Sequence, residues 1–345
     1  MNNVAKVLVV DDSAYVRKVV TQMLSRSPFL EVVATARDGR EALEIAEDVQ
    51  PDVITCDLNM PEMDGIEFVQ AQMARRPVPI VIISVANGAG EQVLAALDAG
   101  AIDFLQKPTA LASDRLFDVS DELVEKVKAA AGAPMNRGRR MQPPARPLAV
   151  ASRTARKDID IVVVGVSTGG PQALKVVMPQ LPADLPVPIG VVLHMPRGYT
   201  ELYAAKLGDL SALKVKEAAE GDEVEPGIVL LAPAGHHLTF RRDGNRVVCH
   251  LDLRPLDTLH RPSVDVLFQS AAEAYGARTL GVVMTGMGSD GREGAAWIKA
   301  RGGRIFTEAE ESCVVYGMPR SVVEAGLSDA AVPLDGMAEA ILRQL

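Results

Sequence analysis

Short aliphatic segments alternate with amphipathic stretches along the chain, and this alternation restricts the possible fold more than any other feature. In the first part, it predicts five strands, at residues 6–10, 30–34, 53–56, 80–83 and 101–105. Helical periodicity lies between them, at residues 14–24, 40–47, 66–73 and 91–99. Strands that alternate with helices form parallel, doubly wound sheets. We therefore expect an α/β domain with a five-stranded parallel sheet.

The same alternation returns in the second part of the chain. Aliphatic segments at residues 161–165, 188–193, 227–231, 279–284 and 303–306 predict strands, and residues 293–300 have a helical pattern. Residues 238–242 and 246–251 flank Asp243 and Gly244, a turn dipeptide that favours a β-hairpin. The second part is thus expected to be a doubly wound, mostly parallel α/β domain with an antiparallel hairpin.

Residues 132–157 separate the two series. They contain four prolines, seven basic residues and no acidic residue, which predicts a solvated, poorly ordered linker; a docking segment for an acidic partner is the alternative. Residues 1–131 carry 21 acids and 12 bases, and residues 158–345 carry 24 acids and 17 bases. Because both predicted domains, 1–131 and 158–345, are acidic, we expect no nucleic-acid partner.

The chain shows no pattern for secretion or membrane insertion. Lys6 and the aspartates after the first predicted strand do not fit a signal peptide, and no apolar run is long enough to cross a bilayer. The three cysteines, Cys56, Cys249 and Cys313, are odd in number and far apart, so they suggest neither a disulfide framework nor a metal cluster. We expect a cytoplasmic protein.

Polar residues directly follow four predicted strands of the first domain: Asp11 and Asp12, Asp57, Ser84, and Lys107. The carboxyl ends of parallel strands meet at one edge of the sheet, so these side chains should lie close together. Clustered carboxylates repel one another unless a divalent cation binds, and oxygen ligands suit Mg²⁺. A lysine and a hydroxyl beside them could hold a phosphoryl group. The alternative is that each acid caps a helix or lies in a solvated loop.

This arrangement resembles the receiver domain of two-component response regulators, over residues 4–130. The segment CDLNMPEMDG (56–65) is similar to the phosphorylation-site motif of that family, and GAIDFLQKP (100–108) to its lysine-containing end. The resemblance implies a flavodoxin-like fold and phosphorylation of Asp57 by a histidine kinase.

The resemblance also implies a role for each residue of the expected site. Asp12, Asp57 and the carbonyl of Asn59 would bind Mg²⁺ with assistance from Asp11. Lys107 would pair with the phosphate, and Ser84 and Phe104 would be the two switch positions.

The stretch IVVVGVSTGGP (161–171) is predicted to be a buried strand that turns sharply into a helix, with Pro171 suited to the first turn. Ser167 lies at the turn, in a G-x-S-x-G pattern with Gly165 and Gly169. Such an elbow can expose a serine as a nucleophile beside the N–H groups of a helix N-terminus. A phosphate-binding turn and a merely tight strand–helix connection are the alternatives.

Two other predicted strands of the second domain end at His194 and near Asp290. With Ser167 they supply the nucleophile, base and orienting carboxylate of an acyl-transfer triad. The order serine, histidine, aspartate differs from that of α/β-hydrolases, so the elbow does not indicate that fold. The other four histidines compete with His194 for the role of base. We interpret the adjacent pair His236 and His237 as structural or surface residues. His250 lies in a predicted strand of the hairpin, and His260 is the fourth competitor.

A competing interpretation concerns Gly286, Gly288 and Gly291, which fit G-x-G-x-x-G after a strand and before a helix. With Glu308 beyond the next strand, this is nearly a dinucleotide-binding fingerprint. Two features weaken it: the motif lies late in the domain, and Asp290 would place a negative charge where a pyrophosphate approaches.

The second domain resembles the catalytic domain of the chemotaxis protein-glutamate methylesterase family, over residues 160–342. The resemblance rests on GVSTGGP (165–171), LHMP (193–196), APAGHHL (232–238), RPSVDVLF (261–268) and VMTGMGSDG (283–291). It implies that the nucleophile is Ser167, the base His194 and the orienting acid Asp290. It also implies that Met287 donates its backbone N–H to the oxyanion and that Thr168 lies at the pocket edge.

Together the two resemblances imply a phosphorylation-regulated hydrolase. It would demethylate glutamate methyl esters, and deamidate glutamines, on chemoreceptors, with a chemotaxis histidine kinase as phosphoryl donor. The receiver would bind Mg²⁺ and the esterase site would need no cofactor. The alternative is a non-enzymatic response regulator whose second domain binds a dinucleotide or a protein partner.

Overall fold

A computed structural model describes residues 4–84, 90–107, 113–133 and 158–345. The chain divides into two compact units, Met1–Gly138 and Arg139–Leu345. Most of the predicted linker lies outside the described residues. Within them, no helix combines the length and the apolar character that crossing a bilayer requires.

The first unit contains a five-stranded sheet with strand order β2-β1-β3-β4-β5. Every pair in it is parallel, as the sequence predicts. The strands are β1 (Ala5–Val10), β2 (Leu30–Ala36), β3 (Val53–Cys56), β4 (Ile80–Ser84) and β5 (Asp103–Gln106).

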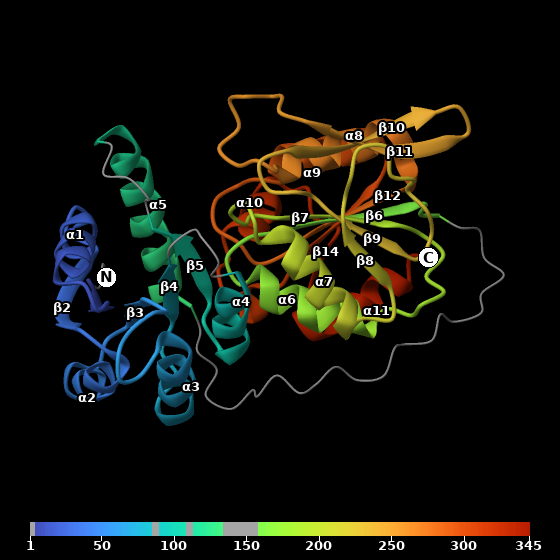
Figure 1. The fold of residues 1–345 in the computed structure, drawn as a ribbon. Helices are drawn as coiled ribbons and strands as arrows, with labels where there is room; N and C mark the ends of the chain where they lie inside the picture. The colour runs from blue at the N-terminus through green and yellow to red at the C-terminus, as the bar shows by residue number, and fades with distance from the viewer. Residues whose placement is uncertain (1–3, 85–89, 108–112, 134–157) are drawn as a thin grey trace. The chain divides into compact units, whose positions relative to one another are not determined.

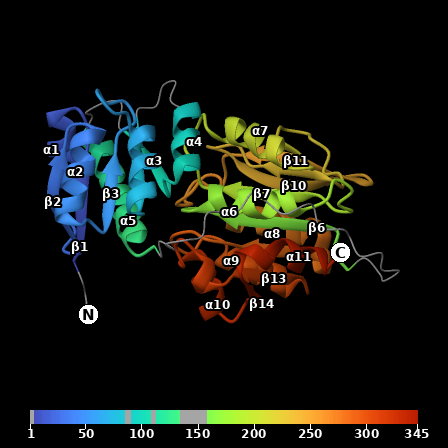
Figure 2. The ribbon, with the colours of Figure 1, turned by 90° about the horizontal axis from the view of Figure 1, so that it is seen from below.

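Five helices cover this sheet. They are α1 (Ala14–Leu24), α2 (Gly39–Val49), α3 (Gly65–Arg75), α4 (Gly90–Ala99) and α5 (Ser113–Ala131). α1 and α5 lie on one face and α2, α3 and α4 on the other (Figures 1 and 2). Polar side chains start three of them by accepting a backbone N–H: Ser13 from Val16, Asp38 from Glu41 and Asp64 from Glu67.

The second unit contains a seven-stranded sheet with order β14-β13-β12-β6-β7-β9-β8. All of its neighbouring strands are parallel. The strands are β6 (Ile161–Val166), β7 (Ile189–Leu193), β8 (Lys214–Glu217), β9 (Ile228–Leu231), β12 (Thr279–Val283), β13 (Arg304–Glu308) and β14 (Ala330–Val332). β7, β9 and β8 lie on one side of β6, and β12, β13 and β14 lie on the other, so the strand order reverses at β6.

The predicted hairpin is β10 (His237–Asp243) and β11 (Arg246–Asp252), which form a separate two-stranded sheet. It packs on the same face of the large sheet as α8 (Val264–Tyr275), α9 (Arg292–Ala300) and α10 (Met318–Glu324) (Figure 1). The opposite face is covered by α6 (Gly170–Val177), α7 (Thr200–Leu210) and α11 (Met337–Leu342). Short 3₁₀ turns are η1 (Met178–Gln180), η2 (Gly276–Arg278), η3 (Glu310–Ser312) and η4 (Leu334–Gly336).

The core between α8 and the sheet fixes the position of that helix. Leu267 and Phe268 of α8 and Ile161 and Val163 of β6 are all fully buried in one apolar cluster. Complete burial of such a side chain contributes about 1.5–3 kcal/mol to folding. The N-terminus of α8 is thereby held beside the carboxyl ends of the central strands.

Candidate active site

Three polar loops follow three adjacent strands at the centre of the large sheet. Ser167 follows β6, His194 follows β7, and residues 285–291 lie beyond β12. In the sheet register, Val166 pairs with Leu193 and Gly165 with Val283, so the three strands end at the same level. Ligand sites in open α/β sheets form at such a reversal of strand order.

The backbone around Ser167 forms a sharp elbow between β6 and α6. The N–H of Ser167 donates to the carbonyl of Thr285 at 3.0 Å, and the N–H of Gly170 donates back to the carbonyl of Ser167 at 2.6 Å. Gly169 has φ +79°, and a Cβ atom there would lie 2.6 Å from Cβ of Val314. Both the backbone conformation and the lack of space therefore require glycine at this position.

The loop after β12 approaches the serine closely through Gly286. A Cβ atom on Gly286 would lie 2.8 Å from Cβ of Ser167 and would also collide with Met318. Met287 directly follows Gly286 in this loop. The loop can come this close because Gly286 has no side chain.

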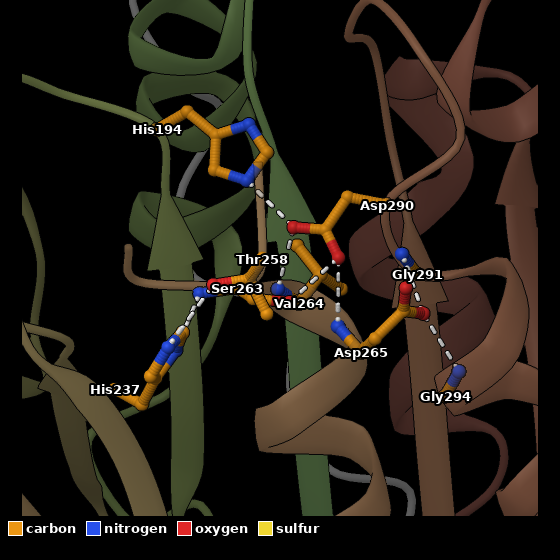
Figure 3. A network of polar contacts seen from close by, with 9 residues as sticks. All are labelled: His194, His237, Thr258, Ser263, Val264, Asp265, Asp290, Gly291 and Gly294. Atoms are coloured by element: carbon orange, nitrogen blue, oxygen red, sulfur yellow. Dashed lines mark hydrogen bonds and ion pairs between the residues drawn. The ribbon is translucent and has the colours of Figure 1, made fainter. Parts of the chain in front are cut away.

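His194 and Asp290 are joined by a hydrogen bond of 2.8 Å between Nε2 and Oδ2 (Figure 3). Both side chains are largely buried, with 8% and 11% exposed. Because a carboxylate only accepts, Nε2 carries the proton and Nδ1 keeps a lone pair. Nδ1 is buried and has no hydrogen-bond partner among the described residues. The histidine therefore has one oriented nitrogen and one nitrogen available as a base.

Asp290 accepts three further hydrogen bonds, all from the start of α8 (Figure 3). The donors are the Ser263 hydroxyl at 2.9 Å, the Val264 N–H at 2.8 Å and the Asp265 N–H at 2.9 Å. Burial alone would raise the pKa of Asp290, but His194 and these N–H donors outweigh it and hold that pKa well below its usual range. Asp290 is thus a stable anion at neutral pH.

Two further histidines contact this network. The imidazole of His260 stacks on His194, with ring centroids 4.0 Å apart. His237 is fully buried, and its Nδ1 accepts from the N–H of Ser263 at 3.2 Å while its Nε2 donates to the carbonyl of Pro255 at 3.1 Å. Burial lowers the pKa of His237, so the ring is neutral there. His237 therefore supports the segment that contains Ser263.

Glu308, the acid of the possible dinucleotide motif, is fully buried. Its carboxylate accepts from the N–H of Thr285 at 2.8 Å and from the hydroxyl of Ser312 at 3.0 Å. A carboxylate enclosed in this way cannot reach a ribose. Together with the engagement of Asp290, this position disfavours the dinucleotide interpretation.

Thr285 connects Glu308 to the elbow. Besides its N–H bond to Glu308 and its carbonyl bond to Ser167, its hydroxyl donates to the carbonyl of Thr168 at 2.9 Å. Thr168 itself is buried, with 2% of the residue exposed. Thr285 thus holds the elbow through its carbonyl and its hydroxyl, while its N–H anchors it to Glu308.

The sequence interpretation gave no supporting role at the esterase site to four residues that hold it, and considered the last of them only as the acid of a dinucleotide motif: Ser263, Asp265, Thr285 and Glu308. A partial signal exists for the first two, because a serine followed closely by an acid is typical of helix N-termini. For Thr285 and Glu308, no local pattern indicates that their side chains meet across the sheet.

The polar strand ends of the first unit also meet. Carboxylate oxygens of Asp11, Asp12 and Asp57 lie within 4.8 Å of one another, so this cluster could hold a divalent cation such as Mg²⁺. Nζ of Lys107 lies 2.6 Å from Oδ2 of Asp11 and 2.8 Å from Oδ2 of Asp57. Burial raises the pKa of Asp57, with Asp11 adding to the effect and Lys107 opposing it.

The remaining residues expected at this edge have different exposures. Ser84 is fully buried, Phe104 is 2% exposed, and Asn59 is exposed. The hydroxyl of Ser84 has no hydrogen-bond partner among the residues that the structure describes.

Both parts of the chain match known protein families. Residues 162–341 match the CheB methylesterase family, and residues 7–118 match the response regulator receiver domain family. A relative in Myxococcus xanthus, named protein-glutamate methylesterase/protein-glutamine glutaminase 5, is 49% identical over 98% of this chain and 97% of its own length. A relative of the same name, without the number, in Halalkalibacterium halodurans is 44% identical over 100% of this chain and 99% of its own.

A solved structure covers the second unit. The Thermotoga maritima CheB methylesterase catalytic domain is 43% identical and matches with a TM-score of 0.53, covering 54% of this chain and 99% of that one. Since the relatives are matched over nearly their whole length, the receiver and the esterase domain occur together in them as they do here. The chain belongs to the CheB methylesterase family, in the form that has a response regulator receiver domain at its N-terminus.

Proposed function

We propose that this protein is a chemotaxis methylesterase that hydrolyses γ-glutamyl methyl esters on chemoreceptors to glutamate and methanol. The observation that carries the proposal is the His194–Asp290 hydrogen bond beside the Ser167 elbow. The full-length relatives named protein-glutamate methylesterase/protein-glutamine glutaminase support this substrate class. No cofactor is needed at this site, because the side chains supply a nucleophile and a base.

In the proposed mechanism, Oγ of Ser167 attacks the ester carbonyl while Nδ1 of His194 takes the hydroxyl proton. Asp290 holds Nε2–H and stabilises the imidazolium that forms. Backbone N–H groups, including that of Met287 in the loop after β12, donate to the oxyanion, with Thr168 at the edge of the pocket. Such a donor lowers the barrier by about 3–4 kcal/mol.

The intermediate then collapses as His194 returns the proton to the leaving methoxide, which departs as methanol. A water molecule attacks the acyl-enzyme by the same route, which releases glutamate and restores Ser167. A glutamine side chain would follow identical steps with ammonia as the leaving group. This accounts for both activities in the names of the relatives.

The receiver unit regulates the esterase in this proposal. Asp57 accepts the phosphoryl group from a chemotaxis histidine kinase. Mg²⁺ would be held by Asp12, Asp57 and the Asn59 carbonyl, with assistance from Asp11. When bound, the cation would neutralise charge on the phosphoryl group. Lys107 pairs with the phosphate, and Ser84 and Phe104 are the two switch positions.

We place the domain limits at residues 1–131 for the receiver and 158–345 for the esterase, with 132–157 as linker. Chemoreceptor adaptation takes place in the cytoplasm, which is where we place the protein.

Replacement of the nucleophile tests the activity. Ser167→Ala should release no methanol from a methylated receptor and should not react with a serine-directed phosphonate, while its thermal unfolding stays that of the parent. Ser25→Ala, at an exposed serine of the first unit, is the control and should keep full activity. Parent-like methanol release by Ser167→Ala would overturn the assignment.

A further inference from the structure

A second carboxylate, Asp265, forms a reciprocal contact with Asp290 between the N-termini of two helices (Figure 3). Asp290 precedes α9, and its side chain accepts the N–H groups of Val264 and Asp265 at the start of α8. Asp265 lies in the first turn of α8, and its Oδ1 accepts from Gly291 at 2.9 Å and Gly294 at 2.7 Å at the start of α9. Each acid therefore caps the helix that the other one begins.

The two helix starts are packed so closely that this contact has little freedom. A Cβ atom on Gly294 would lie 2.9 Å from Cα of Asp265 and 2.6 Å from Cβ of Phe268. Gly291 has φ +100°, and a Cβ atom there would lie 3.0 Å from Cγ1 of Val264. Glycine at both positions lets the N–H groups reach the Asp265 carboxylate.

This contact acts on Asp290 through the main chain. Gly291 directly follows Asp290, so the bond from its N–H to Asp265 fixes the peptide unit next to the carboxylate that orients His194. The bond from the Asp265 N–H fixes the same carboxylate from the other side. Asp265 thus holds Asp290 at two points. Among the described residues, its hydrogen bonds go to Asp290, Gly291 and Gly294 and not to Ser167 or His194.

Burial and the nearby charge of Asp290 both disfavour the ionised form of Asp265. Burial raises the pKa of Asp265, and the negative charge of Asp290 raises it further, while the N–H groups of Gly294 and Gly291 oppose this. Three histidines on neighbouring elements contact the same network: His194 after β7 bonds Asp290, His260 stacks on His194, and His237 on β10 accepts from Ser263. Arg261 contacts His237, and the first-turn charges of α9, Arg292 and Glu293, are exposed.

We propose that Asp265 is a positioning residue for the esterase, which sets the orientation of Asp290 through its hydrogen bonds to the start of α9. This inference rests on the proposed function of the Ser167 site. Position rather than charge is the important property, because the hydrogen bonds to Gly291 and Gly294 require only an acceptor oxygen at that point.

Three substitutions in the full chain separate position from charge. Asp265→Asn keeps an oxygen in the same place without the charge, Asp265→Glu keeps the charge but moves it by one methylene, and Asp265→Ala removes both. We expect kcat for methanol release to stay within about threefold of the parent in Asp265→Asn. It should fall about tenfold in Asp265→Glu and up to about a hundredfold in Asp265→Ala, with KM little changed, because small displacements of catalytic groups have effects of that size.

Glu293→Ala, which removes an exposed acid from the same turn of α9, is the matched control and should have parent kcat. Should Asp265→Ala fail to fold, the comparison of Asp265→Asn with Asp265→Glu decides the question. An active Glu variant with an inactive Asn variant would overturn the proposal, as would parent kcat in Asp265→Ala.

A second readout needs no substrate. The ring N–H proton of His194 that donates to Asp290 should give a downfield NMR signal, assigned by its loss in His194→Gln. We expect Asp265→Asn to keep this signal and Asp265→Glu to shift or lose it; an unchanged signal in Asp265→Glu would contradict positioning. If the parent released no methanol, the proposed function would fail while this measurement still tested the role of Asp265.

Discussion

Nε2 of His194 lies 2.8 Å from Oδ2 of Asp290, although 96 positions separate the two residues in the chain. The contact exists because β7 and β12 both pair with β6, so that the loops after all three strands emerge together. The same bond determines which imidazole nitrogen is free.

Asp290→Asn should reduce kcat on the order of 10³- to 10⁴-fold, as in other triads whose aspartate is replaced by its amide. An amide has one acceptor oxygen, whereas Asp290 accepts at both oxygens, so the NH₂ group would face an N–H or O–H donor. Steady-state methanol release measures the loss. Glu293→Gln is the control, and less than a tenfold decrease in Asp290→Asn would contradict the orienting role.

Gly286→Ala should inactivate the esterase by displacing the nucleophile. The added methyl would lie 2.8 Å from Cβ of Ser167 and would also collide with Met318. The elbow or Met318 must therefore shift to make room. We expect phosphonate labelling of Ser167 to slow about a hundredfold, an effect typical of a misplaced catalytic group. Gly336→Ala, where the nearest atom is 3.7 Å away, should label like the parent. Equal labelling rates in both variants would count against this packing.

His237→Asn should make the esterase unit less sensitive to acid. Because the pKa of His237 is lowered in the folded state, the unfolded chain binds its proton first, and stability falls as pH drops below about 6.5. Asparagine can still accept from Ser263 N–H but does not titrate in this range.

Urea unfolding followed by the fluorescence of Trp297, the single tryptophan, reports on this unit alone. Between about pH 7 and pH 5, the free energy of unfolding should decrease less in His237→Asn than in the parent. His236→Asn, at the adjacent histidine, should retain the parent dependence. Identical pH slopes for the parent and His237→Asn would refute the prediction.

Asp57→Asn should abolish activation of the esterase by a small phosphoryl donor such as acetyl phosphate. The parent should release methanol faster when the donor and Mg²⁺ are both present, and chelation of the cation should remove the effect. Asp57 lies within reach of Lys107 and of two further carboxylates, whereas Asp48 is exposed on α2. Asp48→Asn should therefore respond like the parent; activation that persists in Asp57→Asn would place phosphorylation elsewhere.

Much of the fold could be predicted because strand and helix periods are local properties of the sequence. The five strands of the receiver unit and its helix α1 agree closely with their predicted ranges. The short edge strands β8 and β14 were not predicted. β8 has the sequence KVKE and β14 has three residues, so neither contains an aliphatic run that marks a buried strand.

The kinds of side chain at the two sites could also be predicted from the sequence, because polar residues that follow apolar strands converge at one edge of a parallel sheet. The sequence alone determined that Ser167, His194 and Asp290 belong to one sheet edge, and that Asp11, Asp12, Asp57 and Lys107 belong to another. Only the tertiary structure decided which nitrogen of His194 faces Asp290, that Glu308 holds Thr285 instead of a ligand, and that Asp265 and Asp290 cap each other's helices. These depend on close packing between segments far apart in the chain, and no local pattern encodes such packing.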